Sequence, residues 1–164
     1  MIVLDCSALV DIVRHASNGA LLIERITTGE PIISSSLIHA ELPSALRKYV
    51  RAGLMGKREA LAKMELASTL IDTYAGIAQD RTEAFAESLR LDHSPYDMFY
   101  FILARHNAAT LVTLDRALAN LCKQEGVDCL GPDELAADNV LFMSNAPSEG
   151  DAPSPTDYPG LTQE

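Results

Sequence analysis

The chain has 164 residues, of which 48% are hydrophobic and only 5% aromatic, and its formal net charge is −10. This size and composition predict one packed domain with a mainly aliphatic core. No apolar run approaches the ~20 residues that span a bilayer, and so negative a charge argues against simple electrostatic binding of nucleic acid, which depends on Lys and Arg.

The first half of the chain predicts strands alternating with helices. Residues 2–4 form a short apolar run with two β-branched residues, which indicates a buried strand. A helix follows over residues 7–17, with Ser7 as a candidate N-cap, and its pattern continues to about residue 28. The next predicted elements are a very short strand at 32–33, a helix from Ser36 to about residue 50 with Ser34 to Ser36 offering N-caps, and a helix over 57–72.

The second half continues the alternation. A weak strand or loop at 73–78 precedes helices over 80–90 and 95–107, and Leu111 to Leu114 form a strand. The last predicted elements are a helix over 116–125 and a strand over 127–130. Strands that alternate with helices predict an α/β fold, with a parallel sheet and helices on both faces.

The end of the chain differs from the rest. Residues 144–164 hold half of the eight prolines and four acids, but no Lys or Arg. Such a segment cannot bury enough apolar surface to offset the entropy lost on ordering. We therefore expect a folded domain over residues 1–143 and an acidic, Pro-rich, disordered tail over residues 144–164.

Cysteine content and the N-terminus favour a cytoplasmic protein. Cys6, Cys122 and Cys129 are odd in number and form no CxxC pair, which favours reduced thiols over a disulfide framework or a zinc site. The N-terminus lacks the basic flank and long apolar stretch of a signal peptide. We expect a cytoplasmic location.

Two aspartates occupy equivalent places at the ends of predicted strands. Asp5 follows the run at 2–4, and Asp115 follows the strand at 111–114 and precedes a helix. Ligands of open α/β sheets bind at the carboxyl ends of the strands, so both acids meet at one edge if the strands are neighbours. Capping of the following helix is the alternative explanation for Asp115.

Glu41 lies on or near the apolar stripe of its predicted helix, between Leu37 and Ala45. Burying an unpaired carboxylate is costly, so this side chain needs an ion pair, a route to water or a metal ion. Pro43 removes a backbone donor two residues later and predicts a kink.

Asp97 belongs to Ser94-Pro95-Tyr96-Asp97, a strong helix start with Ser as N-cap and Pro in the first position. Capping alone would explain an acid here. A carboxylate held ionised by the helix dipole suits a metal ligand equally well.

Four acids near one point repel one another unless a cation lies between them. Carboxylates favour hard ions such as Mg²⁺ or Mn²⁺, which can bind phosphate and activate water. No Ser-His-Asp set, P-loop or Gly-rich nucleotide fingerprint competes, and the four histidines lack metal-ligand spacing, which favours surface or capping roles. Residues 47–63 hold six Lys and Arg against one Glu, which indicates either a solvated helix face or a track for phosphates.

These stretches together resemble the PIN-domain family, and within it the VapC-like toxins of bacterial toxin–antitoxin pairs. The resemblance spans about residues 1–135. It rests on IVLDCSALV, SSSLIHAEL, SPYDMFYFILARHNAATLVTLDRAL and VDCL, in the family's order. It implies an αβα sandwich around a central parallel sheet and a ribonuclease that depends on Mg²⁺ or Mn²⁺.

The resemblance also implies site residues and partners. It places Asp5, Glu41, Asp97 and Asp115 at the metal, and Ser7 and Thr113 where relatives often carry a hydroxyl beside the acids. Arg47, Lys48 and Arg51 become candidates for RNA binding, and a homodimer and a cognate antitoxin are expected. Many relatives carry a further acid where this chain has Ala117, so the site rests on four acids.

Two other functions remain open on the residues alone. Ala117 and the negative charge allow a PIN-fold binding module that has lost turnover. A phosphate-accepting receiver domain would use Asp5 as acceptor or metal ligand, but receivers resemble this chain neither at the glutamate helix nor at Ser94 to Asp97.

Overall fold

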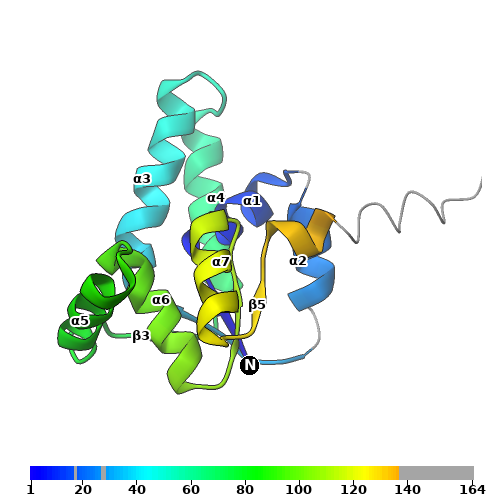
Figure 1. Ribbon diagram of the computed structural model, residues 1–164. Helices are drawn as coiled ribbons and strands as arrows, with labels where there is room; N and C mark the ends of the chain where they lie inside the picture. The colour runs from blue at the N-terminus through cyan, green and yellow to red at the C-terminus, as the bar shows by residue number, and fades with distance from the viewer. Residues whose placement is uncertain (17, 27–28, 137–164) are drawn as a thin grey trace, which may run out of the picture.

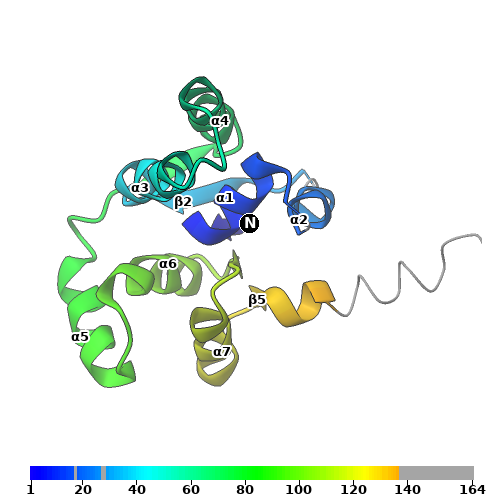
Figure 2. The same cartoon turned by 90° about the horizontal axis from the view of Figure 1, so that it is seen from above.

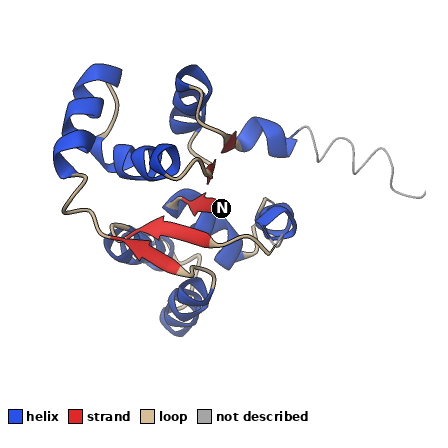
Figure 3. Ribbon diagram, turned by 90° about the horizontal axis from the view of Figure 1, so that it is seen from below, coloured by secondary structure: helices blue, strands red, loops and turns tan. Residues whose placement is uncertain are grey.

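Five parallel strands form the centre of the structure, a computed structural model that describes residues 1–16, 18–26 and 29–136. Their order across the sheet is β3-β2-β1-β4-β5. Figure 3 draws the strands in red between the helices. The strands are β1 (Ile2–Leu4), β2 (Ile32–Ser35), β3 (Thr73–Ala75), β4 (Thr110–Val112) and β5 (Cys129–Leu130).

Helices cover both faces of this sheet, as Figure 2 shows from above. One layer holds α1 (Cys6–Arg14), α2 (Gly19–Ile26), α3 (Ile38–Arg51) and α4 (Lys57–Thr69), and the other holds α5 (Arg81–Leu91), α6 (Pro95–His106) and α7 (Arg116–Glu125). Successive side chains of a strand point to opposite faces. Ile2 and Leu4 accordingly join the core under α1–α4, whereas Val3 joins the core under α5–α7. This is the predicted αβα sandwich.

The strand order places a switch point between β1 and β4. The chain moves from β1 to β2 and β3 on one side, then returns to β4 on the other side of β1. Leu4 of β1 pairs with Val112 of β4, so residues 5 and 113 leave the sheet side by side. A crevice at such a point is the usual ligand site of an open α/β sheet.

Several predicted elements are confirmed, and three details are wrong. The helix over 116–125 appears with these bounds, but the helical pattern from 7 to 28 is two helices, because the chain turns at His15, whose φ is 52°. Asp5, not Ser7, caps α1. Leu37 is the N-cap of α3, in place of the predicted Ser34 to Ser36. Ser34 and Ser35 lie buried in β2, where Ser34 Oγ donates to the carbonyl of Leu4 at 2.7 Å and Ser35 Oγ accepts from Leu37 N at 3.3 Å.

Helices α3 and α4 form an antiparallel hairpin whose connecting turn projects away from the sheet (Figure 1). Pro43 lies inside α3, and the helix continues through it to Arg51. No helix in the described part of the chain is long and apolar enough to cross a membrane. The expected tail at 144–164 lies outside the described residues.

Candidate active site

Asp5 lies at the end of β1 with only 6% of its surface exposed. Its Oδ2 atom accepts hydrogen bonds from Ser7 Oγ at 2.5 Å and from Thr113 Oγ1 at 2.7 Å. Burial raises the pKa of Asp5 above its usual value, although these bonds oppose the shift by favouring the charged form. The carboxylate is therefore costly to ionise in this position without a cation.

Ser7 and Thr113 connect the two strand ends. Each hydroxyl has one proton, and the geometry directs both protons to Asp5. The hydroxyl oxygens in turn accept backbone bonds, Ser7 Oγ from Leu114 N at 2.9 Å and Thr113 Oγ1 from Asp115 N at 3.0 Å. The network fixes Asp5 relative to the start of α7.

Asp115 caps α7. Its Oδ1 atom accepts from the backbone N–H groups of Ala117 at 2.7 Å and Leu118 at 3.1 Å. The capping role considered from the sequence is present, and the side chain is exposed toward the same crevice as Asp5. Capping by one oxygen leaves the carboxylate at the strand edge available for a second interaction.

Glu41 is held by a partner from another layer. The Tyr100 hydroxyl of α6 donates to Oε2 of Glu41 at 2.5 Å, linking α3 to α6 across the end of the sheet. Burial is the main reason that the pKa of Glu41 is raised, and the charge of Asp5 adds to the increase. The bond from Tyr100 opposes it. Tyr100 itself is buried, which raises its own pKa and keeps its proton on the hydroxyl.

Asp97 lies in the first turn of α6, where Ser94 is the N-cap. Oδ2 of Asp97 lies 3.2 Å from Nε2 of His93, a contact without the alignment of a hydrogen bond. Burial raises the pKa of Asp97 to about 6. The charges of Asp5, Asp115 and Glu41 add to this increase, and His93 opposes it. The four predicted acids are thus close enough to influence one another.

The four carboxylates line one pocket of about 640 Å³. Lys48 of α3 is the one predicted RNA-binding residue in its wall; Arg47 and Arg51 are exposed on the same helix but outside the lining. Pro43 predicts a kink in α3 that could turn Glu41 away from the site. In the structure Glu41 nevertheless lines this pocket.

Three residues of this site were missed from the sequence. Asp11 lines the pocket, and its Oδ2 atom is buried without a hydrogen-bond partner among the described residues. The spacing of four residues from Ser7 could have placed it on the same face of α1. Likewise, His93 and Tyr100 stand four residues before and three residues after Asp97. A surface or capping role for His93 is not what the structure shows.

The donor set suits a hard divalent ion, because carboxylate oxygens from four elements converge and repel one another. The side chains are not arranged as metal ligands in this structure. Within residues 1–16, 18–26 and 29–136, no three His, Cys, Asp or Glu residues are placed so that they could hold a metal ion together. Each acid instead has a protein partner of its own. The carboxylate side chains would have to rotate for a metal ion to bind.

The structure is thus a parallel αβα sandwich with an acidic crevice at its switch point. Comparison with models of known protein families identifies the family. The PIN domain profile matches residues 2–124, and the chain belongs to this family. No curated protein matches the chain.

Solved structures support the same fold. The chain is similar to PAE2754 from Pyrobaculum aerophilum, with 20% identity, a TM-score of 0.61, and coverage of 85% of this chain and 95% of that one. It is similar to VapBC2 from Rickettsia felis bound to a promoter DNA fragment, with 19% identity, a TM-score of 0.58, and coverage of 80% of this chain and 98% of that one. It is also similar to VapC20 from Mycobacterium tuberculosis, described as a toxin that cleaves the sarcin–ricin loop. The identity is 18% and the TM-score 0.54, with coverage of 74% of this chain and 95% of that one.

Proposed function

We propose that this chain is an endoribonuclease dependent on Mg²⁺ or Mn²⁺ and the toxin of a VapBC-type toxin–antitoxin pair. The observation that carries the proposal is the gathering of Asp5, Glu41, Asp97 and Asp115 around one pocket with Lys48 in its wall. Membership of the PIN domain family and the likeness to VapBC2 and VapC20 support it.

Asp5, Asp97 and Asp115 are the proposed metal ligands, and Glu41 is a further ligand or the partner of a coordinated water. A bound divalent ion would offset charge on the phosphate and activate water for attack on phosphorus. Among the residues of the chain, Ser7 and Thr113 hold Asp5 in one orientation.

Lys48 would meet the phosphate backbone of the substrate. It is exposed at the pocket wall, whereas Arg47 and Arg51 extend the positive charge along α3. These three cations would offset the repulsion between a single-stranded RNA and a chain of net charge −10. The proposal includes a cognate antitoxin that blocks the crevice. It also includes a homodimer and a cytoplasmic location.

A second function stays in view because two observations favour it. Ala117 stands where many relatives have a further acid, and each of the four carboxylates is engaged by a protein group. Both features suit a PIN-fold module that binds RNA or a partner without turnover. Such a module would bind RNA normally but show no cleavage in Mn²⁺.

The decisive experiment compares RNA cleavage by the wild-type chain and by Asp5→Asn, with Mn²⁺ or with a chelator. Asn keeps the shape of the side chain in its buried place, so lost activity reflects lost charge. We expect cleavage by the wild type in Mn²⁺ alone, and a loss of about a hundredfold or more in the variant.

Asp92→Asn is the matched control, because Asp92 is an exposed carboxylate outside the pocket whose φ of 51° suits Asn. It should cleave like the wild type. Equal cleavage by a highly purified Asp5→Asn preparation would reject the assignment.

A further inference from the structure

Five exposed cations are concentrated toward the tip of the α3–α4 hairpin: Arg47, Lys48, Arg51, Lys57 and Arg58. Among the described residues none of the five forms an ion pair. Elsewhere the pattern differs, since Arg90, Arg105 and Lys123 each pair with two carboxylates. In a chain with 23 acids and 13 Lys and Arg, the hairpin is thus a cluster of cations that form no ion pair within the described residues, whereas Arg81 is a single such cation on α5.

The same chain carries a segment of opposite charge beyond the described residues. Residues 144–164 contain Glu149, Asp151, Asp157 and Glu164 without any Lys or Arg. Their large apolar side chains are Tyr158 and Leu161. The segment therefore combines negative charge with a short apolar motif near its end.

We propose that the acidic tail, residues 144–164, binds the α3–α4 hairpin of its own chain and competes there with RNA. Charge complementarity between the tail and the five hairpin cations is the main argument. The proposed contact rests on the charges of the tail and of the hairpin and does not depend on any activity, whereas the competition rests on the proposed ribonuclease function.

The tail is long enough to reach. The described chain ends at residue 136, after β5, and both Figure 1 and Figure 2 show this end well apart from the hairpin. The remaining 28 residues span up to ~90 Å when extended. A domain of this size has a radius of gyration of only ~14 Å. Tethering also makes the local concentration of the tail high, of millimolar order.

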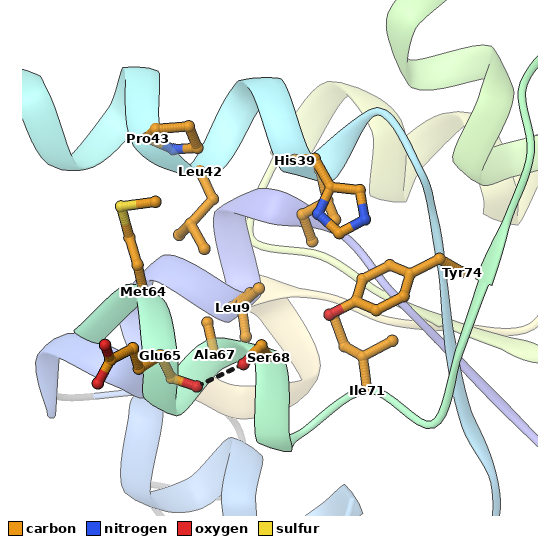
Figure 4. A pocket seen from close by; sticks show the side chains of 11 residues that line it. Leu9, His39, Leu42, Pro43, Met64, Glu65, Ala67, Ser68, Ile71 and Tyr74 are labelled. Carbon is orange, nitrogen blue, oxygen red and sulfur yellow. Dashed lines mark hydrogen bonds between the residues drawn. The ribbon is translucent and has the colours of Figure 1, made fainter. Parts of the chain in front are cut away.

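The hairpin also offers an apolar seat. Between its helices lies a groove of about 290 Å³ whose apolar walls include Leu9, Leu42, Met64 and Ile71 (Figure 4). Pro43 borders it and leaves the His39 carbonyl without its usual helical donor. We assign Tyr158 to this groove, with the acids of the tail running toward the cations at the tip.

Zero-length crosslinking by a carbodiimide tests the contact in the full-length protein without RNA or metal. The chain has four lysines: Lys48, Lys57, Lys63 and Lys123. Lys123 lies on α7, 2.7 Å from Glu134, so it reports both reagent activity and chance encounters with the tail. We expect tail crosslinks to Lys48 and Lys57 to exceed those to Lys123 by about threefold or more at low salt and to fall as salt screens the charges.

Two comparisons make this test decisive. Tyr158→Ser should lower the tail–hairpin yield without altering any charge. Mixing light and isotope-labelled protein separates contacts within one chain from contacts between copies. Crosslinks mainly to Lys123, an absence of tail crosslinks, or mainly mixed-isotope crosslinks would each overturn the proposal.

A second measurement addresses the competition. We expect Glu149→Gln/Asp151→Asn/Asp157→Asn to bind a short single-stranded RNA about tenfold tighter than wild type at about 50 mM salt, in chelator, with the gap closing by about 200 mM. The control Glu24→Gln/Asp92→Asn/Asp128→Asn removes the same charge from exposed acids on other elements. Equal gains in both triple variants would show a net-charge effect and overturn the competition. Crosslinking to Lys48 and Lys57 together with failure to cleave RNA would reject the ribonuclease but keep the tail contact.

Discussion

Thr113 Oγ1 donates a 2.7 Å hydrogen bond to Asp5 Oδ2, joining residues 108 positions apart at the ends of adjacent strands. The same oxygen accepts from the backbone N–H of Asp115. One buried hydroxyl thus connects two of the proposed metal ligands, and its removal leaves an acceptor and a donor without this partner.

Thr113→Val keeps the shape of the side chain and removes this hydroxyl. We expect a loss of about 1–3 kcal/mol in the free energy of unfolding, because buried polar groups are left unsatisfied. Denaturant unfolding measures it. Thr110→Val, at the half-buried start of β4, is the matched control and should change stability much less. Equal costs would mean that the Thr113 bonds add nothing specific.

Tyr100→Phe should move the acidic limb of the pH–cleavage profile to higher pH. The Tyr100 bond lowers the pKa of Glu41 against the effect of burial, so its loss lets Glu41 take up a proton at a higher pH. The profile of kcat/KM against pH measures the shift. Tyr96→Phe alters an exposed hydroxyl and should leave the profile in place. A limb that stays fixed in Tyr100→Phe would remove ionised Glu41 from the mechanism.

Asp97→Asn should stabilise the protein when no metal is present. The folded-state pKa of Asp97 is about 6, above its ordinary value of 3.8, so between these values the folded chain holds a proton that the unfolded chain has lost. Stability therefore falls as pH rises through this window. Near neutral pH the variant avoids a poorly solvated charge, and we expect its Tm to rise by about 2–5 °C.

The pH dependence of that gain provides its own control. The difference in Tm should disappear only below about pH 3, where Asp97 is protonated in both the folded and the unfolded state. Asp92→Asn, outside the pocket, should give a small difference at every pH. Melting curves in chelator over this range measure both variants, and a variant less stable than wild type near neutral pH would contradict the account.

The sequence predicts the positions of the four acids better than their partners. Asp5 and Asp115 end strands, and Asp97 follows a Ser-Pro helix start, so local pattern places each of them. Tyr100 reaches Glu41 only because α6 packs across the sheet from α3, which no local pattern encodes. The contacts of His93 and Asp11 escape prediction for the same reason.

The errors in the fold have local causes. Ser34 is polar and precedes a helical pattern, which predicts an N-cap, yet its hydroxyl donates to the Leu4 carbonyl and so permits burial in β2. The chain turns at His15, whose positive φ is uncommon for a residue other than Gly. The turn dipeptide Asn18-Gly19 marks this break in the sequence, and the helical spacing of the apolar residues on either side outweighs it in the prediction. The parallel order, by contrast, follows from the alternation of strands and helices.

Lys48→Ala should weaken RNA binding more than Arg81→Ala does. Lys48 is exposed in the pocket wall, whereas Arg81 is an equally exposed cation at the start of α5. Loss of one phosphate contact should reduce the slope of log K against log salt by about 0.7 for a single strand. Fluorescence anisotropy in chelator measures both, and identical slopes would exclude Lys48 from the RNA track.

Calorimetric titration with Mn²⁺ tests the central claim most directly. Asp97→Asn/Asp115→Asn removes two proposed ligands, and Asn at residue 115 retains the cap of α7. We predict saturable binding by the wild type and an affinity at least about tenfold lower, or about 1.4 kcal/mol, in the double variant. Indistinguishable titrations of the two proteins at millimolar Mn²⁺ would contradict a metal site in this crevice.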